Sequence, residues 1–114
     1  MKKDIFYYWK IGKLLCSLEK SCFNIHEKFS NYFSYYYGDS FFYTRENLYL
    51  MERFYLSFPI FYDSLSLLSW NQYRILFQIH DREEMFFYFR LSIFFHSDEK
   101  ETLDFIDNRY FLRI

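Results

Sequence analysis

Apolar and polar residues follow one another along the chain with the spacing of amphipathic helices. Between Asp4 and about Lys20, apolar side chains recur among lysines at broadly helical intervals. A second stripe starts at Asn24 and runs to residue 36, with apolar or aromatic side chains at positions i, i+4, i+7, i+8 and i+11. This ladder is typical of one apolar helix face, so we expect two helices before Gly38.

Four later helix starts are marked by side chains that can cap free backbone N–H groups. They are Thr44, Ser69, Asp81 (with Glu84 as a capping-box-like pair) and Ser97 (with Asp98 and Glu99 in the first turn). Pro59 ends the helix that Thr44 begins. We therefore expect helices over residues 44–58, 69–79, 81–95 and 97–108.

These patterns predict an all-α fold, a compact bundle of five to six helices that forms one domain over residues 1–114. The two Gly and one Pro are too few for a turn-rich β architecture. Gly12 lies inside the first helix, where glycine is unfavourable, so we expect it at a close helix–helix contact. The core residues that we expect are Trp9, Phe33, Leu48, Met51, Phe54, Trp70, Tyr73 and Tyr88.

The composition refines this picture. Aromatic residues make up 28% of the chain and Ala and Val are absent, so rings must fill the core. The net charge of -1 gives no global electrostatic argument for nucleic-acid binding. We expect Cys16 and Cys22 to be thiols in a reducing cytoplasm, with a short-loop disulfide as the alternative. No stretch is long and apolar enough for a membrane helix, so we expect a cytoplasmic chain without a membrane partner.

The titratable side chains do not suggest catalysis. His26, His80 and His96 are far apart, and no Ser or Cys stands in a nucleophile context. Two acidic pairs, at residues 83–84 and 98–99, are explained by the preference of helix N-termini for negative charge. We therefore expect no catalytic residue, no metal site and no cofactor.

Five blocks, in order, resemble the N-terminal domain of the YhcG-like nuclease family. They read YWKIGK at 8–13, YTRENL at 43–48, LSWNQYR at 68–74, DREE at 81–84 and IDNRYFLR at 106–113. The family has Tyr-Trp-x-Ile-Gly-Lys, Ser-x-Arg-Asn-Leu, Leu-Ser-Trp-Ser-His-Tyr-Arg, Asp-Pro-Glu-Glu and Ile-Asp-x-x-x-Tyr-x-Arg. The chain departs from these motifs at Glu46, where the family usually has Arg, and at Gln72, where it often has His.

The resemblance implies a helix-turn-helix-like domain that binds DNA. In full-length relatives this domain precedes a PD-(D/E)xK endonuclease domain, to which nothing here corresponds. We therefore expect a non-catalytic chain, which could be a truncated gene product.

In the helix-turn-helix interpretation, the helix that begins after Thr44 is the recognition helix for double-stranded DNA. Arg and Asn side chains make bidentate contacts to guanine and adenine, and Lys contacts phosphates. The candidate nucleic-acid-binding residues are Arg45, Asn47, Tyr49, Arg53 and Lys28. Two simpler interpretations stay open. In the first, the arginines are solvated and the asparagine bonds to local backbone. In the second, the chain is a protein-interaction module. Such a module would pair through an aromatic face with itself or with a full-length nuclease relative.

Overall fold

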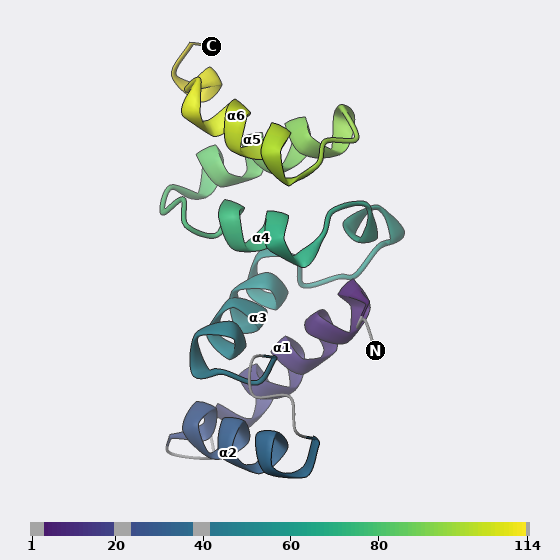
Figure 1. Cartoon of the computed structure of the whole chain (residues 1–114), viewed down its shortest axis with the longest axis vertical. Coiled ribbons are helices and arrows are strands. Elements are labelled where there is room, and N and C mark those ends of the chain that lie inside the picture. The colour runs from purple at the N-terminus through teal and green to yellow at the C-terminus, as the bar shows by residue number, and fades with distance from the viewer. Residues whose placement is uncertain (1–3, 20–23, 38–41, 114) are drawn as a thin grey trace. The chain divides into compact units, whose positions relative to one another are not determined.

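The structure, a computed structural model, describes residues 4–19, 24–37 and 42–113. In these segments it contains six α-helices and two short 3₁₀-helices, and none of the described residues lies in a strand (Figure 1). The elements are α1 (Ile5–Glu19), α2 (Ile25–Tyr37), α3 (Arg45–Ser57), η1 (Asp63–Leu67), α4 (Trp70–Leu76), α5 (Arg82–Phe94), α6 (Glu99–Asp107) and η2 (Tyr110–Arg113). The predicted all-α fold is confirmed.

The chain divides into two compact units, Met1–Phe61 (unit 1) and Tyr62–Ile114 (unit 2). Unit 1 contains α1, α2 and α3, and unit 2 contains the later helices. Each unit buries its own set of apolar side chains.

Three of the four predicted N-cap residues cap their helices, and at Asp81 only the Asp81 half of the predicted capping box with Glu84 is present. The side chains of Thr44, Ser69 and Asp81 each accept a hydrogen bond from the backbone N–H three residues later, at 3.2, 3.2 and 2.8 Å. At Ser69 the capping box is complete, because the side chain of Gln72 accepts from the Ser69 N–H at 2.9 Å. Local hydrogen-bond chemistry therefore fixes where α3, α4 and α5 begin.

Two helix boundaries differ from the prediction. Asp98, not Ser97, caps α6, and its carboxylate accepts from the Glu101 N–H at 2.8 Å. The Ser97 N–H instead bonds to the carbonyl of Ser92 at 2.9 Å and so belongs to the turn that follows α5. α4 ends at Leu76 rather than Ile79, because the N–H groups of Gln78 and Ile79 bond to carbonyls three residues back.

Unit 1 is organised around the contact between α1 and α3. A Cβ atom built on Gly12 would lie 2.0 Å from the carbonyl oxygen of Met51 and 2.6 Å from its carbonyl carbon. The two helix backbones therefore touch, and the predicted close contact at Gly12 is confirmed. Leu48, Met51 and Phe54 are completely buried on the facing stripe of α3.

Aromatic side chains also pack in the interior of unit 1. The buried Trp9 donates its indole N–H to the carbonyl of Phe58 at 2.7 Å. Its ring contacts those of Tyr55 and Phe61, with centroids 5.5 and 5.8 Å away. Of the two phenylalanine rings on α2, Phe29 is buried and Phe33 is not.

The expected burial of Phe33 is therefore wrong: its ring is half-buried and stacks on Phe29 at 4.1 Å. Both positions lie on the same helix stripe, and the turn carrying Phe29 is the one more deeply buried. The other seven predicted core residues are buried: Trp9, Leu48, Met51, Phe54, Trp70, Tyr73 and Tyr88.

Unit 2 buries Tyr73 completely, and its hydroxyl donates to the carbonyl of Leu65 at 2.6 Å. Burial, with a smaller contribution from nearby Tyr62, raises the pKa of Tyr73 far above its ordinary value. This phenol is therefore a fixed hydrogen-bond donor that ties α4 to η1.

A small polar cluster lies within the apolar interior of unit 2. The Gln72 amide donates to the carbonyl of Ser97 at 2.8 Å and to the hydroxyl of Thr102 at 3.0 Å. The Thr102 hydroxyl also bonds to that of Ser92 at 2.9 Å. All four residues are buried, and within the described segments the Ser97 hydroxyl has no hydrogen-bond partner. Gln72 thus links α4 to α5 and α6 through these polar side chains.

We expect Gly12→Ala to destabilise the protein by about 3 kcal/mol or more, because the added methyl would overlap the backbone of α3. On helix propensity alone the same change would stabilise by about 1 kcal/mol. Urea unfolding followed by circular dichroism measures the loss. Ser17→Ala, at an exposed position of α1, is the control and should stay within about 0.5 kcal/mol of the parent. Equal stability of the two variants would contradict the contact.

The polar cluster makes opposite predictions for two of its hydroxyls. Thr102→Val removes a partner of both Gln72 and Ser92 and should cost about 1–3 kcal/mol. Ser97→Ala removes a buried hydroxyl that has no partner among the described residues, so stability should stay the same or rise. Denaturant midpoints compare the two, and a Ser97→Ala loss as large as that of Thr102→Val would show that the serine is bonded.

Candidate nucleic-acid interface

The candidate recognition helix α3 starts at Arg45, directly after its cap Thr44. Arg45, Tyr49 and Arg53 follow one another at intervals of four residues, so they lie along one side of the helix. Asn47 lies on a different side. Its side-chain amide donates to the carbonyl of Phe42 at 2.8 Å, which braces the start of α3.

The exposure of the cationic candidates differs. Arg45 and Lys28 are exposed, on α3 and α2 respectively. Tyr49 is 56% exposed. Arg53 is half-buried, and this burial lowers the pKa of its guanidinium from the ordinary arginine value. Three of the candidates therefore face solvent, while Arg53 is partly withdrawn from it.

A buried polar pair lies beside this surface. The imidazole Nε2 of His26 on α2 is 2.7 Å from a carboxylate oxygen of Glu52 on α3. Both residues are buried, and the ring of Tyr49 stacks on that of His26 with centroids 3.8 Å apart. One face of the Tyr49 ring therefore packs on the His26–Glu52 pair that joins α2 to α3, and this contact holds the ring in place.

This pair was not predicted from the sequence, although the sequence carries a signal for it. Glu52 follows the buried Leu48 by four residues, and His26 precedes the buried Phe29 by three. Each polar residue therefore falls on an apolar stripe of its own helix. Two such exceptions on neighbouring helices are expected to be partners, since buried charged groups are usually paired.

The charges of the chain are unevenly shared between the units. Unit 1 includes eight Lys or Arg residues and six Asp or Glu, whereas unit 2 includes six and nine. The formal net charges are therefore +2 and -3, which together give the -1 of the whole chain. The candidate interface lies in the positive unit.

Two further predictions from the sequence, the helix-turn-helix arrangement and the state of the two cysteines, are not tested by the structure. α2 ends at Tyr37 and α3 begins at Arg45, a spacing longer than the three- to four-residue turn of a helix-turn-helix. The helix-turn-helix arrangement therefore stays a prediction.

Cys16 is half-buried on α1, but Cys22 lies outside the described residues, so the state of the two cysteines also stays a prediction.

No metal centre or membrane span stands out in the described segments. Within them, no three or more His, Cys, Asp or Glu side chains gather closely enough to hold a metal ion. None of the described helices has the combination of length and apolar content that crossing a membrane requires.

The six helices and their caps define a small all-α domain that contains the five sequence blocks in order. A family model described as the DUF1016 N-terminal domain matches residues 2–113. The chain therefore belongs to the DUF1016 (YhcG-like) family, and its 114 residues are this N-terminal domain, with no room among them for a nuclease domain. No curated protein matches the chain, and no solved structure does.

We expect His26→Ala to destabilise the protein by about 3 kcal/mol, because it removes the imidazole from a buried carboxylate. Glu52→Gln keeps a hydrogen-bonding side chain of the same shape and should cost less. Thermal or urea unfolding of both variants checks the order. His80→Ala, at an exposed position of unit 2, is the matched control and should be close to neutral. If His80→Ala cost as much as His26→Ala, the buried pair would not be what holds α2 to α3.

Proposed function

We propose that the protein binds double-stranded DNA through unit 1, without cleaving it. The observation that carries the proposal is the exposed side of α3, where Arg45 and Tyr49 lie one turn apart in the unit of positive net charge. A helix that presents such side chains near its N-terminus suits the major groove. This function would be exercised in the cytoplasm, the compartment that we infer for the chain.

Each candidate residue has a distinct role in this proposal. Arg45 contacts a guanine edge or a phosphate, and Lys28 contacts phosphates. Tyr49, stacked on His26, offers its exposed face and hydroxyl to the DNA backbone. Asn47 holds the start of α3 through Phe42, and the partly buried Arg53 contributes less than Arg45.

A second candidate function is self-association through aromatic side chains. Tyr32 and Tyr35 are 57% and 82% exposed and lie three residues apart on α2, so they share one side of that helix. Tyrosine is enriched at protein interfaces. A second copy of the chain is the occupant that we consider for this surface.

The salt dependence of DNA affinity tests the first candidate. With three to five phosphate contacts, log affinity should fall against log salt with a slope of about -3 to -4, at ~0.9 per contact. Arg45→Ala should flatten the slope by about one, and Arg53→Ala by less, because Arg53 is partly withdrawn from solvent. Glu46→Arg should tighten binding, since it replaces a negative charge beside Arg45. Fluorescence anisotropy with a labelled duplex measures all four proteins.

Arg74→Ala is the matched control, since it removes the same charge from an exposed helical position of the negative unit. It should leave affinity and slope unchanged. Equal effects of Arg74→Ala and Arg45→Ala would contradict the assignment to α3. Undetectable binding at low salt, together with a dimer in sedimentation that Tyr35→Ser dissolves, would favour self-association instead.

A further inference from the structure

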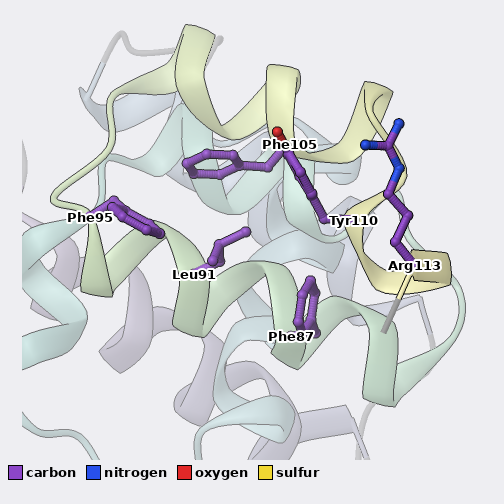
Figure 2. Close-up of a pocket in the computed structure, with 6 residues that line it drawn as sticks. All are labelled: Phe87, Leu91, Phe95, Phe105, Tyr110 and Arg113. Carbon is purple, nitrogen blue, oxygen red and sulfur yellow. The ribbon is translucent and has the colours of Figure 1, made fainter.

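Unit 2 contains a pocket of about 380 Å³ that belongs to neither the polar cluster nor the candidate interface. It lies between α5 on one side and α6 with η2 on the other (Figure 2). The lining residues are Phe87, Leu91, Phe95, Phe105, Tyr110 and Arg113. The volume falls in the range of small-molecule sites, about 300–1,000 Å³.

The pocket is elongated along α5. Phe87, Leu91 and Phe95 recur every four residues and so form one stripe, which spans about 12 Å at 1.5 Å per residue. Phe105 and Tyr110 face this stripe from the other side of the pocket. Their own ring centroids lie 6.2 Å from each other. Phe95 and Tyr110 are 56% and 40% exposed, so the pocket opens to solvent.

Arg113 supplies the one charge of the described lining. Its guanidinium lies 5.4 Å from the ring centroid of Tyr110. Figure 2 shows Arg113 beside Tyr110 at one end of the pocket and Phe95 at the other end. Among the described residues, no carboxylate lines the pocket and none forms a salt bridge with Arg113. The pocket therefore combines a long apolar wall with a cation at one end.

We propose that this pocket binds a medium-chain fatty acid, with the alkyl chain along α5 and the carboxylate at Arg113. An extended alkyl chain matches the length of the stripe better than a compact aromatic acid does. The guanidinium fork can receive the carboxylate through two parallel hydrogen bonds, the strongest pairing available to that group. The proposal is independent of DNA binding, which concerns the other unit.

Isothermal titration with decanoate, below its micellar concentration, tests the site on the full chain. We expect saturable binding, and octanoate should bind about tenfold more weakly because it lacks two buried methylene groups. Arg113→Gln should weaken decanoate about tenfold, the loss of one charge-assisted contact, while leaving the binding of decanol unchanged. Indole-3-acetate, an aromatic acid, should bind more weakly than decanoate.

Arg90→Gln is the matched control, because Arg90 is an exposed cation of α5 that lies over the ring of Phe86 and does not line the pocket. It should bind decanoate as the parent does. Leu91→Trp should abolish binding by filling the pocket, and circular dichroism checks its fold. If that variant does not fold, Arg113→Gln at its exposed position still decides the question.

Three binding results would overturn the proposal. They are no saturable binding of decanoate, equal losses in Arg113→Gln and Arg90→Gln, and tighter binding of indole-3-acetate than of decanoate. A parent protein that self-associates and becomes monomeric in Leu91→Trp would also overturn it, since the occupant would then be a second copy.

Discussion

The backbone of α1 touches the backbone of α3 at Gly12, and the rest of unit 1 is arranged around this contact. Gly12 lies against the carbonyl of Met51 and the N–H of Glu52, at distances that leave no space for a side chain. The carboxylate of the same Glu52 binds His26 and so holds α2. One turn of α3 therefore contacts both neighbouring helices. Tyr49, one turn earlier on α3, stacks on the His26 ring of this contact.

Helix positions could be predicted where they depend on neighbouring residues in the sequence. Thr44, Ser69 and Asp81 bond to N–H groups three residues away, so the sequence contains both partners of each cap. Phe33 and Ser97 were assigned wrongly because each competes with a neighbour of the same chemistry, Phe29 or Asp98. Which of two such residues is buried or caps depends on packing with distant segments, and periodicity alone carries no information about that.

In the candidate sites, too, features set by nearby residues could be predicted and features set by distant segments could not. The shared side of Arg45 and Tyr49 follows from a spacing of four residues, which the sequence provides. The partial burial of Arg53 depends on its surroundings in the folded chain, as does the pairing of His26 with Glu52. The pocket of unit 2 needs α5, α6 and η2 together, and no local pattern marks such a convergence.

α4 has seven residues, whereas isolated helices shorter than about 12–15 residues are marginal in water. Its order depends on the Ser69 capping box and on Gln72 and Tyr73, which bond to segments outside the helix. We therefore expect α4 to open together with its neighbours rather than as a separate element. The slowest amide hydrogen exchange in α4 should accordingly report the opening of unit 2 as one cooperative body, with little contribution from fraying of the helix ends.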